Sequence, residues 1–281
     1  MPSQHQAIDA DPALEGVYRA ISGYVAAERQ PPAEFWGALV RRALDEVIDG
    51  PRTSRWSLDQ LSTTEQTYVG TKAEILVRNA LDLEPGLETD VSVEGEDVDI
   101  KWSKTLEWQI GPENVGKICL GLGLSSGGRH FSVGLFRASR ENLRAGRNRD
   151  RKTSLTADAF RSQVVWLVRD AELPPNFVEM LAPDVRRRIL AGRSAQERIR
   201  LLAELVPGVP IPRVAFETVA RDKRDPMRRL RRDASRSSPL GDMVLLSTKY
   251  ARRELTALGF GELPKDHWVS VRASDLAKIS R

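Results

Sequence analysis

The chain has 281 residues, 41% of them apolar and 29% charged, which is enough for one large domain or two ordinary domains of a globular protein. A single cysteine, Cys119, and three scattered histidines exclude an internal disulfide framework and argue against a zinc site or a Ser-His-Asp triad. No run approaches the roughly 18–20 apolar residues of a membrane span, and the first residues lack the pattern of a secretory signal. We therefore expect a cytoplasmic protein with no membrane partner.

The charge is distributed unevenly along the chain. Residues 1–170 carry 21 basic and 25 acidic residues, whereas residues 171–281 carry 22 basic and 14 acidic residues. An acidic front half and a basic rear half are typical of a catalytic module joined to a nucleic-acid-binding module. A merely soluble basic surface is the alternative interpretation.

Three helices are predicted in the first third of the chain. Apolar residues recur at helical spacing between residues 13 and 48, and Pro31-Pro32 divides this stretch into two helices. A third helix is expected from about Ser62 or Thr63 to Leu81, and Glu74 lies on it. We interpret these segments as packing helices.

Residues 89–104 have the pattern of a β-hairpin, because two short alternating runs flank Glu94-Gly95-Glu96. Asp99 and Lys101 are two residues apart, so in a strand their side chains point to the same face. Asp90 lies where the partner strand begins. Two carboxylates and an ammonium on one sheet face are poor core material, but they can hold a divalent cation against a phosphate.

The middle of the chain completes the predicted sheet. We expect a strand at 106–110, a helix from Pro112 through Leu122 that ends in a glycine-rich loop, and strands at 130–136 and 164–168. Residues 137–152 are rich in arginine. Residues 170–176 contain paired prolines and are the best linker candidate.

The rear half predicts helices at 177–190, 194–205 and 212–220, and then an arginine-rich helix at 226–236. A short helix, a tight turn and a basic helix are the plan of a helix-turn-helix. Strand-like runs at 243–246 and 268–271, which flank a helix at 250–258, suggest a wing.

The catalytic hypothesis depends on the Asp-x-Lys pattern, which occurs at Asp99–Lys101 and again at Asp150–Lys152. Only the first lies in a predicted strand with Asp90 opposite and Glu74 on the preceding helix. That order is the arrangement of a restriction-type nuclease core, an α/β fold with a mixed sheet and flanking helices. The alternative is a surface hairpin in which Asp99 and Lys101 form only a salt bridge.

The chemistry of phosphodiester cleavage accounts for these residue types. Carboxylate oxygens hold Mg²⁺, and the metal lowers the pKa of its bound water. We assign Asp90 and Asp99 as metal ligands, and Glu74 as a ligand through water or as an orienting group. Lys101 is assigned as the catalytic lysine, which orients the water or stabilises charge on the phosphoryl oxygens.

From about residue 57 to 272 the chain resembles the NaeI family of type II restriction endonucleases. The front half of this resemblance rests on Ser57–Leu61, Thr64-Glu65, Val69–Thr71 and Glu74, with Asp90 and Val98–Lys101 at matching separations. The rear half rests on Ile211–Arg213, the arginine-rich helix and Val269–Arg272. Thr89 stands where the wider superfamily commonly has proline, and Trp102 follows the lysine, but neither departure removes a ligand.

The resemblance implies a restriction-endonuclease-like PD-(D/E)xK domain at 1–169 and a winged helix-turn-helix domain at 170–281. It also implies Mg²⁺-dependent cleavage of both strands of double-stranded DNA by a homodimer, at a short GC-rich palindrome such as GCCGGC. A second copy of the site would bind the rear domain as an allosteric effector. Thr64 would join Glu74, Asp90, Asp99 and Lys101 in the active-site set.

The predicted DNA contacts are arginines in two basic segments and at the start of one helix. Some of those in the rear segment would meet phosphates, and one or two would reach guanine edges. A solvated helix and a basic surface loop are the alternative interpretations of the two segments. The residues are Arg213, Arg228, Arg229, Arg231, Arg232 and Arg236 in the rear half, and Arg147 and Arg149 in the front half.

Two other functions stay open on the sequence alone. A repair nickase of the MutH type shares the order of acidic residues and lysine, but it would cut one strand. A winged-helix regulator whose front domain only dimerises would have no catalytic activity.

Overall fold

The computed structural model describes residues 11–146, 148–221 and 240–279. The chain forms two compact units, of which unit 1 comprises residues 1–47 and 61–175 and unit 2 comprises residues 48–60 and 176–281. The predicted domain limit at 169/170 falls inside the last strand of unit 1, which continues to Glu172. Arg147, Arg228, Arg229, Arg231, Arg232 and Arg236 lie outside the described residues.

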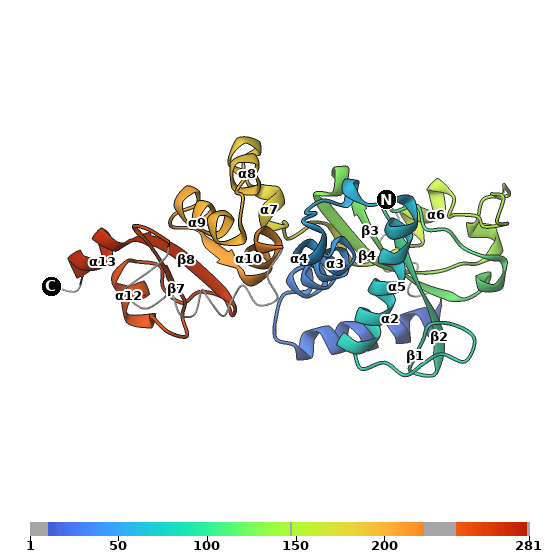
Figure 1. The fold of residues 1–281 in the computed structure, drawn as a ribbon. Helices are drawn as coiled ribbons and strands as arrows, with labels where there is room; N and C mark the ends of the chain where they lie inside the picture. Colours follow the sequence, from blue (N-terminus) through green and yellow to red (C-terminus); the bar gives the residue numbers. More distant parts are fainter. Residues whose placement is uncertain (1–10, 147, 222–239, 280–281) are drawn as a thin grey trace. The chain divides into compact units, whose positions relative to one another are not determined.

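Unit 1 is built on a five-stranded mixed sheet in the order β1-β2-β3-β4-β5 (Figure 1). Strands β2 and β3 are parallel, and the other neighbouring pairs are antiparallel. The strands are β1 (Val91–Val93), β2 (Glu96–Ser103), β3 (Ile118–Ser125), β4 (His130–Arg137) and β5 (Val165–Glu172). A mixed α/β unit of this kind fits the restriction-endonuclease-like fold.

The helix predicted from Pro112 through Leu122 is wrong. Only the 3₁₀ turn η2 (Pro112–Asn114) is helical there, and the apolar run that follows is the central strand β3. A strand that is covered on both faces has no alternation of apolar and polar residues, so its sequence does not distinguish it from a buried helix. Gly121 is required inside this strand, because a Cβ there would meet the Trp108 ring at 2.4 Å.

The strand predicted at 106–110 is also wrong, because this segment forms only a single bridge, between Ile110 and Thr153. Trp108 within it is buried among aromatic rings instead, and it stacks on Phe136 at a centroid distance of 5.2 Å. Its indole nitrogen donates to the Leu122 carbonyl at 2.9 Å. Side-chain packing, not strand pairing, therefore fixes this segment.

The helices of unit 1 begin at recognisable signals. Helices α2 (Pro12–Ala27) and α3 (Pro32–Ile48) are separated at Pro31-Pro32, as predicted. Helix α5 (Thr63–Ala80) begins with a capping box, in which Ser62 and Glu65 satisfy each other's backbone amides. It packs against β2, so it lies beside the hairpin. The short helix α6 (Ala157–Ser162) precedes β5.

Unit 2 contains a three-stranded antiparallel sheet in the order β6-β8-β7 and a set of short helices. Its strands are β6 (Pro210–Pro212), β7 (Met243–Leu246) and β8 (His267–Arg272). Its helices are α4 (Gly50–Thr53), α7 (Phe177–Met180), α8 (Pro183–Leu190), α9 (Ala195–Leu205), α10 (Arg213–Ala220), α12 (Arg252–Ala257) and α13 (Ala273–Ile279), with a 3₁₀ turn η1 at Leu58–Gln60.

Several predictions for unit 2 can be compared with these elements. The strands expected near 243–246 and 268–271 are present, but the single helix expected at 177–190 is two helices. Pro183 opens the second of them and keeps the residue before it out of the helical region. The basic helix expected at 226–236 lies outside the described residues, so the winged helix-turn-helix stays a prediction.

The core of unit 2 also incorporates residues from the front of the sequence, since α4 packs against α10. A buried arginine, Arg198 on α9, is 1% exposed and donates to carbonyls at the C-terminal end of α10 and to Gly192. No helix in the described part of the chain is long and apolar enough to cross a membrane.

Candidate active site

The β1–β2 hairpin sets the positions of the catalytic candidates. Glu94 and Gly95 both have positive φ, 51° and 81°, as a two-residue type I′ turn requires. The register pairs Val93 with Glu96 and Val91 with Val98. Because side chains alternate along a strand, Asp99 and Lys101 then share one face of β2.

Asp99 and Lys101 form a close ion pair, with Lys101 Nζ 2.6 Å from Asp99 Oδ2. Asp99 is only 5% exposed, so this charge is held away from solvent. Burial raises the pKa of the Asp99 carboxyl, and the hydrogen bond from Lys101 opposes that rise. Repulsion by Asp90 and Glu113 adds to the rise in the pKa of Asp99.

Asp90 is the residue before β1, and its carboxylate is hydrogen-bonded to the partner strand β2 next to the backbone pairing of the two strands. Its Oδ2 accepts a hydrogen bond of 2.6 Å from the backbone N–H of Ile100, the residue between Asp99 and Lys101. The preceding loop is fixed by Asp97, whose carboxylate accepts from the backbone amides of Leu87 and Glu88 at 2.8 and 3.1 Å. The structure therefore holds Asp90 against the same segment of β2 as the ion pair.

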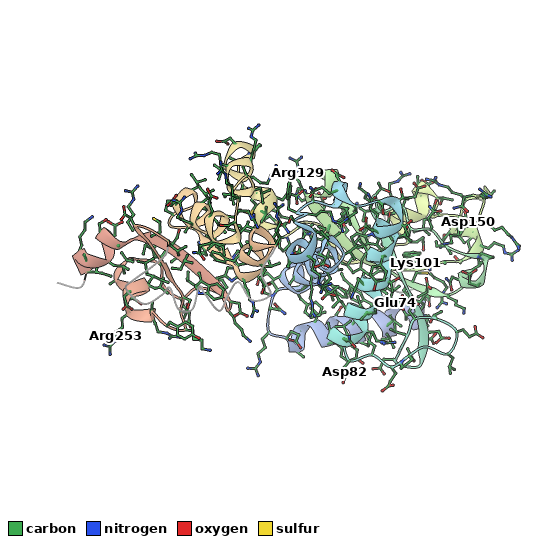
Figure 2. The ribbon with its side chains drawn as sticks, viewed as in Figure 1. Glu74, Asp82, Lys101, Arg129, Asp150 and Arg253 are labelled. Carbon is green, nitrogen blue, oxygen red and sulfur yellow. The ribbon has the colours of Figure 1, made fainter. Side chains whose placement is uncertain are left out.

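Glu74 approaches the group from helix α5. The pKa of its carboxyl is raised by burial first and then by repulsion from Asp90, and Asp99 adds a smaller repulsion. Lys101 acts in the opposite direction on the same pKa. Figure 2 shows Glu74 on α5 in the same region of unit 1 as Lys101 on β2. Helix α5 thus carries a third carboxylate whose charge interacts with those of Asp90, Asp99 and Lys101.

The donor set fits a hard divalent cation such as Mg²⁺. Carboxylate oxygens are the ligands that Mg²⁺ prefers, and the mutual repulsion of Glu74, Asp90 and Asp99 is what a cation would relieve. Among the residues that the structure describes, no three acidic, histidine or cysteine side chains are already arranged at metal-binding geometry.

The comparison with known proteins identifies the family of the chain. Residues 25–278 match the family described as restriction endonuclease NaeI. The chain belongs to this NaeI family. The type II restriction enzyme NaeI of Lentzea aerocolonigenes is 35% identical over 209 residues, which cover 72% of this chain and 65% of that enzyme. The chain thus matches less than two thirds of the length of this relative.

Thr64, the other active-site residue expected from the NaeI resemblance, lies in the first turn of α5. It precedes Glu74 by ten residues, which is about 15 Å along a helix axis at 1.5 Å per residue. The described contacts do not bring its side chain to the carboxylate group. A role for Thr64 stays a prediction.

The second Asp-x-Lys pattern has a different environment from the first. Asp150 and Lys152 lie in an exposed loop that is shaped by Asn148, whose side-chain oxygen accepts from both of their backbone amides. Arg149 is exposed in the same loop. Neither described contacts nor burial connect this loop with Asp99 and Lys101.

In unit 2, Arg213 is the predicted DNA-binding residue that the structure describes. It begins α10 and forms an ion pair of 2.7 Å with Glu217. It also lines a cleft of ≈ 490 Å³, whose other cationic lining residues are Lys249, Arg252 and Lys265. The sequence analysis did not identify this cleft, because its residues come from three separate segments.

Sequence reasoning also missed Asn114, which contacts Asp99 directly. Its side-chain amide donates to Asp99 Oδ1 at 3.0 Å, and both residues are buried. Pro112-Glu113-Asn114 reads as a helix start, and nothing in that local pattern indicates a partner fifteen residues earlier.

Proposed function

We propose that this protein is a type II site-specific deoxyribonuclease that hydrolyses both strands of double-stranded DNA and depends on Mg²⁺. The observation that carries the proposal is the buried Asp99–Lys101 ion pair, with Asp90 held on the same strand segment and Glu74 directed at it from α5. Membership of the NaeI family supports the same activity.

The residues have distinct roles in this mechanism. Asp90 and Asp99 would hold Mg²⁺, with Glu74 as a further ligand or an orienting group. When bound, Mg²⁺ supplies a water of lowered pKa and neutralises charge on the phosphate. Lys101 lies beside Asp99, where it would orient the attacking water or stabilise the developing charge on the phosphoryl oxygens.

We also propose that unit 2 binds DNA, and that the cleft beside Arg213 contacts the phosphate backbone. Its four lysine and arginine lining residues outnumber the two acidic ones, Glu262 and Asp266. Glu262 forms an ion pair with Arg252 at 2.7 Å, and Lys249 lies 5.3 Å from the ring centroid of Tyr250, which is exposed. Cations and an exposed aromatic ring are the groups that phosphates and sugars meet on DNA-binding surfaces.

The resemblance to the family supports proposals on the oligomeric state, the recognition sequence and the effector site. We propose a homodimer that acts in the cytoplasm on a short GC-rich palindrome such as GCCGGC, and a second copy of that site that binds unit 2 as an effector. The arginines at 228–236 would then add base and phosphate contacts to those of the cleft.

Plasmid cleavage tests the activity directly. Supercoiled plasmids with one or two copies of the palindrome are incubated with the full chain in Mg²⁺ or in EDTA, and the products are separated by electrophoresis. We expect linear DNA in Mg²⁺ only, and faster cleavage of the two-site plasmid. Nicked circles alone would indicate a MutH-type nickase, and intact plasmid under all conditions would favour a non-enzymatic regulator.

The second Asp-x-Lys pattern provides a matched control for this experiment. Asp99→Ala should abolish cleavage, whereas Asp150→Ala removes an aspartate in the same short pattern from an exposed loop and should leave cleavage unchanged. Equal loss in both variants would contradict the assignment of the site.

The DNA-binding role of the cleft has its own measurement. Lys249→Ala and Lys265→Ala should each reduce the slope of log affinity against log salt by about 0.9, the value for one phosphate contact on B-DNA. An unchanged slope in both variants would exclude the cleft as a backbone contact. Cleavage and salt dependence therefore test the two units separately.

A further inference from the structure

The buried side-chain amide of Asn114 contacts Asp99 of the Asp99–Lys101 ion pair. Asn114 ends the 3₁₀ turn η2 and is 5% exposed. Its backbone N–H donates to the Gly111 carbonyl at 3.1 Å, and its own carbonyl accepts from the Lys117 amide at 3.2 Å. The turn is thus fixed on both sides, and the Asn114 side chain is directed at β2.

The two oxygens of the Asp99 carboxylate have separate partners. Oδ1 accepts from the Asn114 amide at 3.0 Å, whereas Oδ2 faces Lys101 Nζ at 2.6 Å. Cys119, opposite Asp99 on the parallel strand β3, has its sulfur 3.9 Å from Oδ2. A carboxylate held at both oxygens cannot rotate freely, so its plane is set before any ligand arrives.

From this geometry we propose that Asn114 is a positioning residue, which orients the Asp99 carboxylate for cation binding by holding Oδ1. This inference rests on the proposed function, in which Asp99 is a Mg²⁺ ligand. Partners that hydrogen-bond to a ligating side chain fix its orientation, and their loss typically weakens metal affinity or activity by 10–100-fold.

The type of residue supports this role. Asn offers two N–H donors on a short side chain, and an acidic residue in the same place would add a further buried negative charge. A leucine has the same branched arrangement of side-chain heavy atoms as an asparagine but no donor, and its methyl groups occupy more space. Asn114→Leu therefore removes the hydrogen bond with a larger side chain, and Asn114→Ala removes it with a smaller one, so an effect common to both variants reports the lost donor.

Binding of Mn²⁺ to the full chain, followed by electron paramagnetic resonance without DNA, measures this positioning independently of cleavage. We expect Asn114→Leu to weaken Mn²⁺ binding by about 10-fold or more. In an Asp99→Ala background the same substitution should change Mn²⁺ binding by less than about twofold, since the carboxylate that it positions is gone. Unchanged Mn²⁺ affinity in Asn114→Leu would overturn the proposal.

A control separates positioning from general loss of stability. Asn176 is also buried, but it caps α7 by accepting from the amides of Val178 and Glu179 in unit 2. Asn176→Ala should lower the melting temperature and leave Mn²⁺ affinity unchanged. If Asn114→Leu does not fold, Asn114→Ala replaces it in the same titration with the same expected loss of affinity.

The titration also separates this inference from the proposed function. If the wild-type chain fails to cleave any plasmid but still binds Mn²⁺ in a manner that depends on Asp99 and Asn114, the positioning role holds and the nuclease function fails. If the chain cleaves DNA and Asn114→Leu binds Mn²⁺ and cleaves as the wild type does, the nuclease function holds and the positioning role is wrong.

Discussion

Asp11 has two structural roles in unit 1, and substitution can separate them. Its Oδ1 caps helix α2 by accepting from the Leu14 amide at 3.1 Å. The same carboxylate forms a two-pronged ion pair with Arg137 at the end of β4, in which Nη2 donates to Oδ1 at 2.9 Å. Arg137 also donates to the Gly116 carbonyl at 2.9 Å. Asp11 therefore fastens the first described helix to the sheet.

Two variants divide these contributions. Asp11→Asn keeps a side-chain oxygen for the cap but removes the charge, whereas Asp11→Ala removes both. A cap contributes about 1 kcal/mol and a hydrogen bond to a charged group about 1.5–3 kcal/mol. We expect Asp11→Ala to lower the free energy of unfolding by about 2–4 kcal/mol, and Asp11→Asn by about 1 kcal/mol less than that.

The pH dependence gives a second, independent check. The hydrogen bond from Arg137 lowers the pKa of the Asp11 carboxyl in the folded chain. The ion pair therefore stabilises the fold fully above the unfolded pKa, about 3.9, and this stabilisation is lost as the pH falls through the lower folded pKa. Urea unfolding followed by tryptophan fluorescence, at intervals from pH 7 to pH 3, should show wild type and Asp11→Asn converging in acid. A constant difference over that range would refute the reasoning.

Three further predictions concern the two units. Lys101→Met should reduce single-turnover cleavage by about 10²–10³-fold, the effect of removing one preorganised donor, while DNA binding in Ca²⁺ is retained; a loss of binding of the same size would contradict a catalytic role. Arg198→Met should lower the free energy of unfolding of unit 2 by about 1–3 kcal/mol in urea, because it leaves buried α10 carbonyls without their donor, whereas Arg200→Met at a half-exposed position should have little effect. Glu74→Gln should raise the melting temperature in EDTA, because it removes a carboxylate whose raised pKa shows that the fold disfavours its ionised form; a lower melting temperature would exclude repulsion as the cause.

The Asp99–Lys101 ion pair was predictable because its geometry is local. Strand alternation places residues two apart on one face, so Asp99 and Lys101 follow from the sequence once the hairpin is recognised. Glu94-Gly95 indicates the hairpin, because a type I′ turn requires positive φ at both of these positions. The position of Asp90 was predictable in the same way, because it lies where the partner strand of the hairpin begins.

The rest of the site depends on contacts that are distant in sequence. Asn114 reaches Asp99 only because β2 and β3 are parallel, and a parallel pair requires a crossover whose path the local pattern does not specify. Strand β3 was not predicted because its buried apolar run lacks the alternation of apolar and polar residues that indicates a strand. Burial on both faces removes the periodic signal that sequence reasoning uses.

The division into units shows a similar limit. Residues 48–60 precede α5 in sequence, yet they pack within unit 2, where α4 contacts α10. A single linker at 170–176 was predicted because paired prolines mark it. The segment at 48–60 begins with Asp49-Gly50-Pro51, which marks a turn, but a turn signal does not specify the unit in which the following residues pack.

The active site gathers like charges, and the sheet beneath it must stabilise that arrangement. The raised pKa values of Glu74 and Asp99 mean that the folded chain holds their ionised forms at a cost in free energy. Lys101 and the N–H donors of Ile100 and Asn114 offset part of this cost. Burial of the apolar side chains of β3 and β4 is the main contribution that stabilises the fold. A divalent cation would relieve the same repulsion. If it binds the folded site and not the unfolded chain, as proposed, the melting temperature of unit 1 should rise with the Mg²⁺ concentration.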